Sequence, residues 1–474
     1  MSASGFPVAK PLPSVWTEEP HVLDDYRSAE TLSGEFDIAI IGSGFSGVST
    51  AYHILKISST APAVVLLEAR SHCSGATGRN GGHIKPDTYY STTKYERIYG
   101  SEQASKLQKF ESSQVLAVKE LVESEGLDCD FHVTRAVDVY MDPDHARQTY
   151  AAYVKLRDSG FFDLKDVAYT DSSSAERISG VKGAQSLFSF TAAYLWPRKM
   201  VLGLLQRLIQ QHDVKAYAQT PVAKVSKSRD SAGFWTIFTS RGNLRARKIV
   251  YATNGYTAAL LPQYSRKIVP VRGVCSHITT PRGQNSPHLP NTYSLRFGGA
   301  NYDYLVPRPD GSIVVGGARQ TFLHDRDLWF NTVRDDQRMS MAADKYFQNY
   351  MQQHFRGWED SKATTKRVWT GVMGYTSDYM PHIGEVPDMP GQYIIAGFTG
   401  RGMAYILLAS KALSRMIVEG IDYEQTELPA MFESTKERLS SSESELENEF
   451  SGVWNLKEKD HAGDFVAPIL RARL

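Results

Sequence analysis

A glycine pattern near the N-terminus is typical of backbone that binds phosphate. Gly42, Gly44 and Gly47 form G-x-G-x-x-G directly after the apolar run at 36–41, and the apolar residues that follow recur at helical spacing. The first glycine permits a tight turn, the second lets the backbone approach a pyrophosphate, and the third allows close packing of helix on strand. The spacing therefore predicts the first half of a dinucleotide-binding fold, with a purely structural turn as the alternative.

Glu68 supplies the second feature of such a site. It ends the predicted buried strand at 63–68 and lies 26 residues after Gly42. A carboxylate at this position can accept hydrogen bonds from both hydroxyls of an adenosine ribose, and it would repel a 2′-phosphate. We therefore expect a dinucleotide whose adenosine ribose is unphosphorylated.

The loop after Glu68 decides between NAD and FAD. Residues 69–83, ARSHCSGATGRNGGH, form a second glycine-rich segment directly after the acidic residue. An NAD site needs no such segment, whereas small residues here let the chain pass close to the ribityl chain and ring of a flavin. The loop also carries one fixed cation, Arg79. The sequence therefore predicts FAD, with a flexible surface loop as the alternative interpretation.

The elements that position these residues alternate between two kinds of pattern. Strand, glycine turn and helix occur near the N-terminus and again at 391–413, while an alternating strand is predicted at 131–141. Pro309-Asp310-Gly311 predicts a hairpin turn between two short strands. Helices are expected at 101–125, 143–158 and 197–211.

These patterns predict an α/β protein in which a Rossmann-type FAD-binding domain is interleaved with an α+β substrate domain that contains an antiparallel sheet. The predicted division of the chain is an arm at 1–33, the FAD-binding domain at 34–90, 196–265 and 361–430, the substrate domain at 91–195 and 266–360, and a polar tail at 431–474.

The motifs together resemble the D-amino-acid oxidase superfamily of FAD-dependent enzymes, which includes glycine oxidase, sarcosine oxidase and gamma-glutamylputrescine oxidase. The resemblance covers most of residues 36–425, and the GATGRNGGH stretch is most similar to gamma-glutamylputrescine oxidase. The Pro-rich arm and CSGATGRNGGHIKPD suggest a fungal branch. The motifs that carry the resemblance to the superfamily are GSGFSG, LLEAR, GATGRNGG, YATNGYTAALLP, YLVPRPDGSIVVGG and GFTGRGM.

The resemblance implies further cofactor contacts. Val222 is expected to reach the adenine through its backbone, and 252–255 should pass near the pyrophosphate. Residues 398–404 should place a helix N-terminus against the pyrimidine edge of the flavin, where amide donors stabilise the negative charge of the reduced ring. Arg401 either adds to that effect or is a surface charge. The expected FAD-binding residues are Gly42, Gly44, Phe45, Ser46, Gly47, Glu68, Ala69, Arg70, Gly75, Ala76, Thr77, Arg79, Asn80, Gly81, Gly82, His83, Val222, Ala252, Thr253, Asn254, Gly400, Arg401, Gly402 and Met403.

Three residues are candidates for the substrate site by the same resemblance. Tyr304 matches the substrate-facing tyrosine of glycine oxidase, or it is a half-buried strand residue. Lys85 matches the approximate place of a carboxylate-binding arginine in sarcosine oxidases, or it is a surface lysine. His83 either bonds or links the flavin or is a structural histidine.

Two departures from the family pattern concern the substrate and the flavin. Met373 occupies the position where amino-acid oxidases of this group carry an arginine for the substrate carboxylate. The segment 369–384 has no cysteine, so a linkage there is excluded and noncovalent FAD is expected. The lysine that helps oxygen react in sarcosine oxidase has no counterpart in 313–317, which puts rapid reaction with oxygen in doubt.

The amino-acid composition argues against nucleic acid and anionic membranes as binding partners. Lys plus Arg number 53 and Asp plus Glu 52, so no strong field favours nucleic acid or an anionic membrane. No apolar window is long enough to span a bilayer. The three cysteines, Cys73, Cys129 and Cys275, fit a reducing compartment, and no metal site is predicted.

The chain ends in Ala472-Arg473-Leu474, which resembles the peroxisomal import tripeptide. The polar stretch at 437–450 would tether this end away from the folded body. We therefore expect binding to the peroxisomal import receptor and a peroxisomal location, or otherwise a cytoplasmic one.

The expected activity is oxidation of an amine or amino-acid-like small molecule. Hydride passes from the carbon next to nitrogen to flavin N5, water hydrolyses the imine, and oxygen is reduced to hydrogen peroxide. The alternatives are a flavin dehydrogenase or secondary-metabolism flavoenzyme with another electron acceptor, and a flavin-binding protein without turnover.

Overall fold

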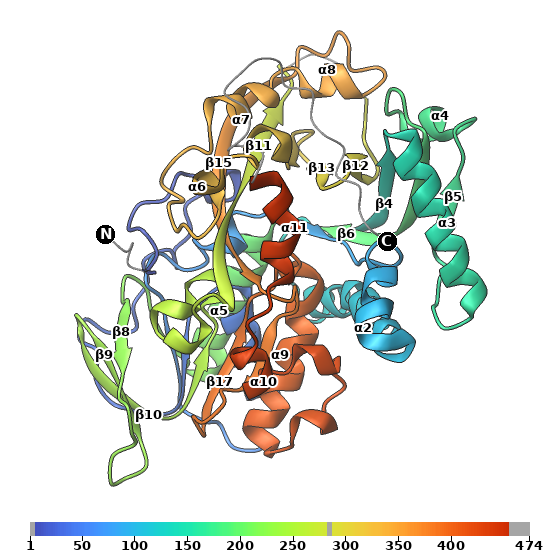
Figure 1. The fold of residues 1–474 in the computed structure, drawn as a ribbon. Coiled ribbons are helices and arrows are strands. Elements are labelled where there is room, and N and C mark those ends of the chain that lie inside the picture. The colour runs from blue at the N-terminus through green and yellow to red at the C-terminus, as the bar shows by residue number, and fades with distance from the viewer. Residues whose placement is uncertain (1–4, 282–286, 455–474) are drawn as a thin grey trace.

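Two β-sheets, each assembled from separated stretches of chain, organise the computed structural model, which describes residues 5–281 and 287–454. Figure 1 shows the parallel sheet with its helices in the lower half of the molecule and the antiparallel sheet in the upper half. Along the sequence the chain alternates several times between strands of the first sheet and strands of the second. This confirms the predicted interleaved α/β architecture.

The first sheet is mainly parallel, in the order β16-β17-β10-β1-β2-β7. Its middle strand β1 pairs in parallel with β2 on one side and β10 on the other. Every residue of β2 is buried, as expected for a parallel strand covered on both faces. The strands are β1 (Glu35–Ile41), β2 (Val64–Leu67), β7 (Lys215–Tyr217), β10 (Gly242–Tyr251), β16 (His382–Glu385) and β17 (Gln392–Ala396), with β8 (Val222–Val225) and β9 (Trp235–Thr239) attached through β10.

Three helices cover one face of this sheet. α1 (Phe45–Ile57) packs against α9 (Gly402–Glu419) and α5 (Pro197–His212), and their apolar residues form one core with Ile38 and Ile40 of β1. Side chains alternate along a strand, so Ala39 and Ile41 face the opposite way and join a second core with residues of β9 and β10.

The second sheet is antiparallel except for the parallel pair β12 and β4. Its main order is β15-β11-β14-β13-β12-β4-β6-β3, and β5 (Ala168–Thr170) pairs with β6. The strands are β3 (His83–Ile84), β4 (His132–Tyr140), β6 (Ser186–Tyr194), β11 (Ile268–Thr279), β12 (Thr292–Gly298), β13 (Asn301–Pro307), β14 (Ile313–Gly316) and β15 (Thr364–Thr376).

Most predicted elements form where expected. β13 and β14 pair through the turn at Pro309-Asp310-Gly311, where Gly311 has a φ of 79°. α2 (Thr92–Ser124) begins earlier than the predicted helix at 101–125 because two helices meet at a non-helical Gly100. The remaining helices are α3 (Pro143–Ser159), α4 (Ala175–Ser179), α6 (Arg326–Trp329), α7 (Met341–Tyr346), α8 (Tyr350–His354), α10 (Lys436–Ser440) and α11 (Glu445–Trp454).

Both ends of the described chain are packed on the body. Trp16 of the N-terminal arm is buried, and its indole donates to the carbonyl of Asn80. The polar segment expected as a tether instead contains α10 and α11, and Leu446 and Phe450 of α11 are buried. The tripeptide Ala472-Arg473-Leu474 lies outside the described residues.

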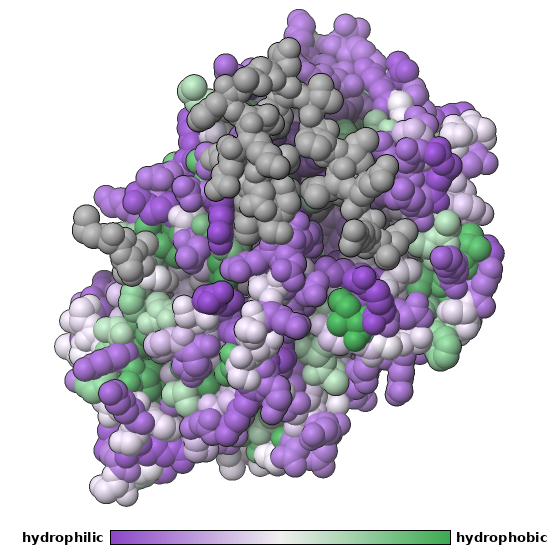
Figure 2. Space-filling view, viewed as in Figure 1, coloured by the Kyte–Doolittle hydropathy of each residue, from purple (hydrophilic) through white to green (hydrophobic). Residues whose placement is uncertain are grey.

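The visible surface in Figure 2 is mainly hydrophilic, with hydrophobic residues in small separate groups. Among the helices of residues 5–281 and 287–454, none combines the length and apolar character required to cross a bilayer. The same residues contain no cluster of three or more His, Cys, Asp or Glu side chains suited to a metal ion.

Candidate active site

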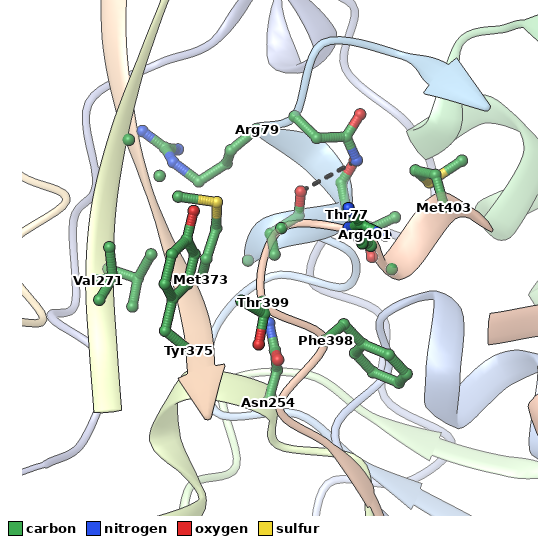
Figure 3. A pocket seen from close by; sticks show the side chains of 18 of the residues that line it. Thr77, Arg79, Asn254, Val271, Met373, Tyr375, Phe398, Thr399, Arg401 and Met403 are labelled. Atoms are coloured by element: carbon green, nitrogen blue, oxygen red, sulfur yellow. Dashed lines mark hydrogen bonds between the residues drawn. The ribbon is translucent and has the colours of Figure 1, made fainter. Parts of the chain in front are cut away.

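A cavity of about 480 Å³ lies between the two sheets. Its walls come from the glycine turn before α1, the loop at 75–81, the start of α9, and one face of the antiparallel sheet. Figure 3 shows the strand residues Val271, Met373 and Tyr375 on one side of this space, with Thr77 and Arg401 across from them. One cavity thus joins the predicted nucleotide site to the predicted substrate domain.

The glycine turn is held as the motif requires. Gly42 has a φ of 109°, and a Cβ there would lie 2.5 Å from the carbonyl oxygen of Ala252. A Cβ at Gly47 would overlap the carbonyl of Gly42. Only glycine fits at both positions, and the backbone between them faces the cavity at the N-terminus of α1.

Glu68 is fixed beside this turn. One carboxylate oxygen accepts from the amide of Ser43 at 3.0 Å and from its hydroxyl at 3.1 Å, and the other accepts from the amide of Arg70 at 3.1 Å. Glu68 still lines the cavity together with Val222 and Ala252. The carboxylate therefore has the position expected for a group that binds the adenosine ribose.

The second glycine-rich loop, at 75–82, is hydrogen-bonded to the start of α1 and to the N-terminal arm. The amide of Phe45 donates to the hydroxyl of Thr77 at 2.9 Å, and the amide of Gly82 donates to the Asn80 side chain at 2.7 Å. The Asn80 amide group in turn donates to the carbonyls of Ala76 and Thr77. The loop is therefore a rigid wall of the cavity and not a flexible surface segment.

Two arginines of this loop region share one buried carboxylate. Asp335 lies 3.1 Å from the Arg70 guanidinium and 3.6 Å from that of Arg79. Arg79 also donates to the carbonyl of Thr370 at 2.6 Å, and burial lowers its pKa to about 10. Asp335 therefore holds both guanidinium groups in place in the wall of the cavity.

The start of α9 forms another wall, where the loop before the helix passes through Gly400 at a φ of 80°. Arg401 lines the cavity, and its paired guanidinium excludes the alternative of a simple surface charge. Its guanidinium pairs with Asp87 at 2.6 Å and Glu111 at 3.1 Å inside the protein. The amide groups of Gly402 and Met403 lie at the helix N-terminus beside the cavity, which suits a negatively charged ring edge.

The antiparallel sheet presents small residues to the cavity. Gly273 of β11 pairs directly with Gly371 of β15, and both line the cavity. Met373 lies two residues further along β15, and a Cβ at Gly400 would lie 3.6 Å from its sulfur. The uncharged thioether of Met373 therefore lies between β15 and the start of α9.

Tyr304 lies on this face of the sheet, but its ring is packed rather than free. It fills the space left by the missing side chains of Gly81 and Gly316, and its hydroxyl lies 3.1 Å from the sulfur of Cys275. Burial raises the pKa of Tyr304 well above its usual value. The tyrosine is a neutral wall residue of the cavity in this structure.

Lys85 and His83 both line the cavity and both have protein partners. The Lys85 ammonium lies 2.9 Å from Asp138, so it is not a free surface lysine. His83 shares a hydrogen bond of 2.7 Å with the hydroxyl of Thr292. Burial, helped by the charge of Lys85, lowers the pKa of His83 to about 3, so its ring is neutral.

The structure brings the predicted residues together around one space. The predicted cofactor and substrate residues line the cavity except Gly47, Gly82 and Gly255. A Cβ at Gly47 or Gly82 would overlap a backbone carbonyl, so these two glycines shape the loops beside the cavity. Sequence reasoning missed several cavity residues, because their partners are distant in sequence: Phe6, Asp87, Glu111, Tyr256, Arg296, Arg319 and Tyr375.

These walls fit FAD. The glycine turn and Glu68 suit the adenosine diphosphate half, and the cavity continues from them to the start of α9 and the sheet face. The buried hydroxyl of Tyr256 lines the same space and has no hydrogen-bond partner among the described residues. Such an unsatisfied group is costly unless a ligand bonds it.

Comparisons with known proteins agree with this geometry. A family profile described as "DAO: FAD dependent oxidoreductase" matches residues 37–416. A probable oxidoreductase OrdL of Rhizobium meliloti is 23% identical, covering 78% of this chain and 80% of its own. The gamma-glutamylputrescine oxidoreductase of Escherichia coli is 21% identical, with 83% and 86% covered.

A solved structure shows the same fold. The crystal structure of glycine oxidase from Geobacillus kaustophilus matches with a TM-score of 0.67 and 20% identity, covering 85% of this chain and 99% of that one. The profile match spans most of the chain and includes the glycine turn, Glu68 and the start of α9. The chain therefore belongs to the DAO family of FAD-dependent oxidoreductases, and its cofactor is FAD.

Proposed function

We propose that this enzyme oxidises the carbon–nitrogen bond of a small amine or amino-acid-like substrate and passes the electrons to oxygen. The observation that carries the proposal is the single cavity that joins the FAD site to the glycine-lined face of the antiparallel sheet. The relatives named as gamma-glutamylputrescine oxidoreductase and glycine oxidase act on amines, which supports the same class of substrate here.

The residues of the chain contribute placement rather than acid–base chemistry. Bound FAD supplies the acceptor for the hydride that leaves the carbon next to nitrogen. The two sheets enclose the substrate, and the neutral ring of His83 adds no charge beside it. Water hydrolyses the resulting imine to a carbonyl compound and an amine, and oxygen takes up two electrons and two protons to give hydrogen peroxide.

The electron acceptor has a second candidate. The strand β14 (Ile313–Gly316) is wholly buried and carries no charged side chain that would assist the reaction of reduced flavin with oxygen. A dehydrogenase that passes electrons to another acceptor is therefore the alternative to an oxidase.

An anaerobic substrate screen tests both parts of the proposal. Purified holoenzyme is mixed without oxygen with primary and secondary amines and amino acids, and the flavin absorption is followed. We expect at least one of them to bleach the flavin, and admission of air to restore the colour with release of peroxide. Failure of every amine contradicts the substrate class, and bleaching that air does not reverse favours the dehydrogenase.

We also propose that the enzyme is imported into peroxisomes through Ala472-Arg473-Leu474, because catalase there would remove the peroxide. A fluorescent fusion that keeps the natural C-terminus should enter peroxisomes, and deletion of Leu474 should leave it in the cytosol. Peroxisomal fluorescence without Leu474 would contradict the proposal.

A further inference from the structure

Arg319 is a cation of the active-site cavity that has no carboxylate partner among the residues that the structure describes. It begins a short 3-10 turn directly after β14 and lines the cavity. One nitrogen of its guanidinium donates to the carbonyl of Ala300 at 3.3 Å, and another donates to the hydroxyl of Tyr375 at 3.1 Å. A guanidinium has five N–H donors, so three remain for a ligand.

The other cations of the cavity are already occupied. Arg70 and Arg79 share Asp335, while Lys85 and Arg296 share Asp138. Two more arginines of the cavity walls are also held: Arg401 pairs with Asp87 and Glu111, and Arg272 donates to the carbonyls of Leu328, Gln337 and Arg338.

Within residues 5–281 and 287–454, no carboxylate oxygen lies within 4 Å of Arg319. The negative charge of Glu449 in α11 raises the pKa of Arg319 from a distance beyond 4 Å. That carboxylate accepts a hydrogen bond from the Tyr379 hydroxyl at 2.5 Å. Arg319 and Arg272 are therefore the two cations of the described cavity walls that form no ion pair with a carboxylate. Arg272 is buried and directs both terminal nitrogens to backbone carbonyls, whereas Arg319 keeps three N–H groups, so a bound anion would reach Arg319 more readily.

Arg319 lies close to Met373, the position where the resemblance to amino-acid oxidases implies an arginine for the substrate carboxylate. Tyr375, which accepts its hydrogen bond, lies two residues after Met373 on the same face of β15. A Cβ at Gly400 would lie 3.5 Å from the Tyr375 hydroxyl and 3.6 Å from the Met373 sulfur. Arg319 thus reaches the neighbourhood of Met373 from the turn after β14, through its hydrogen bond to Tyr375.

The loop that carries Arg319 is rigidly built. Gly317 has a φ of 131°, and a Cβ there would lie 2.6 Å from the carbonyl of Tyr302. The amide of Ala318 donates to the buried carboxylate of Asp303 at 2.7 Å. The guanidinium also lies 4.9 Å from the centre of the Tyr302 ring, a cation–π contact. A charge held on so many sides is preorganised to bind a ligand.

We propose that Arg319, with the Tyr375 hydroxyl, binds a carboxylate of the substrate and takes the place of the arginine that Met373 replaces. The substrate is then an amine that carries a carboxylate, which the planar guanidinium binds through paired hydrogen bonds. This inference rests on the proposed oxidation of an amine, but carboxylate binding can be measured without turnover.

Binding of a simple carboxylate to the oxidised holoenzyme tests the inference. Benzoate is titrated against the flavin absorption spectrum, and benzamide serves as the uncharged probe of the same shape. We expect benzoate to bind and benzamide to bind at least tenfold more weakly. Arg319→Gln should weaken benzoate binding about 10- to 100-fold and leave benzamide binding unchanged. Arg319→Lys should restore part of the benzoate affinity, because it keeps the charge without the fork.

Controls separate this result from general damage. Arg338→Gln removes an exposed arginine outside the cavity and should bind benzoate like the wild type. Flavin content and the melting temperature are compared for all variants. Wild-type benzoate affinity in Arg319→Gln, or equal affinity for benzoate and benzamide in the wild type, would overturn the proposal.

The two proposals can fail separately. If amines bleach the flavin but Arg319→Gln leaves benzoate affinity and the KM for every reactive amine unchanged, the anchor is wrong and amine oxidation stands. If benzoate binding depends on Arg319 but no amine bleaches the flavin, the anchor stands and the proposed reaction is wrong.

Discussion

The carboxylate of Asp335 accepts hydrogen bonds from the Arg70 guanidinium at 3.1 Å through both of its oxygens, although 265 residues separate the two in the sequence. Asp335 is fully buried and also faces Arg79 at 3.6 Å. The contact ties the loop after Glu68 to the segment between α6 and α7, so one carboxylate fixes the wall of the FAD site from the other half of the molecule.

Asp335→Ala leaves two buried guanidinium groups without their counter-charge. We expect the free energy of unfolding to fall by about 3–5 kcal/mol, measured by urea denaturation of the holoenzyme. Asp336→Ala is the matched control, because Asp336 pairs with Arg334 near the surface and should change stability by no more than about 1 kcal/mol. Similar losses in both variants would show that the Asp335 contacts do not stabilise the site.

Glu68→Ala should release FAD more readily. The variant loses the acceptor for the Ser43 amide and the group expected to bind the adenosine ribose. Flavin retained per chain after gel filtration measures the effect, and exposed Glu30→Ala serves as the control. An unchanged flavin content in Glu68→Ala would refute the ribose assignment.

Glu111 should make stability depend on pH. Burial raises its pKa from 4.5 to about 7, against the opposing effect of Arg401. Between these pH values the folded chain holds a proton that the unfolded chain has released, so this contribution to stability is lost as the pH rises through about 7. Relative to Glu111→Gln, the wild type should lose about 1–3 kcal/mol of unfolding free energy between pH 5 and pH 8.

Urea unfolding at both pH values measures this difference. Glu120→Gln, an exposed change on the same helix α2, should run parallel to the wild type. A wild type and a Glu111→Gln variant that also run parallel would contradict the raised pKa.

Gly316→Ala should displace the ring of Tyr304. The added Cβ would overlap the ring and hydroxyl of the tyrosine, which has no free space because it also fills the gap at Gly81. We expect a loss of about 1–3 kcal/mol in the free energy of unfolding and a change in the flavin spectrum. Gly203→Ala in α5 is the control, since its nearest neighbour is the end of the Leu127 side chain. Unchanged stability and spectrum in Gly316→Ala would show that the ring moves freely.

The local parts of the site could be predicted from the sequence because their conformation depends on residues that are close together in the chain. The turn at Gly42, the carboxylate of Glu68 and the loop at 75–82 each depend on residues close in the chain, and the structure places them together. The same holds for the hairpin at Gly311 and for α3, whose predicted start at Pro143 is confirmed.

Long-range pairings could not be predicted in the same way. Asp335 with Arg70 and Arg296 with Asp138 each join segments more than 150 residues apart, and only the tertiary fold brings them together. The ion pairs of Arg401 with Glu111 and Asp87 were not predicted, because they join residues 290 and 314 apart in the sequence. The sequence did not single out Arg319, because its role as a ligand-binding cation depends on having no carboxylate partner among the described residues, which only the fold reveals.

The most direct test of the account compares amines with alcohols of the same carbon skeleton in anaerobic flavin reduction. Glycine with glycolate and alanine with lactate are such pairs, and an amine found in the substrate screen extends the set with its own alcohol. The account predicts that the amine of a reactive pair bleaches the flavin, that deuterium on the carbon next to nitrogen slows the bleaching, and that the alcohol leaves the flavin oxidised. Reduction by the alcohols, with every amine inert, would contradict it.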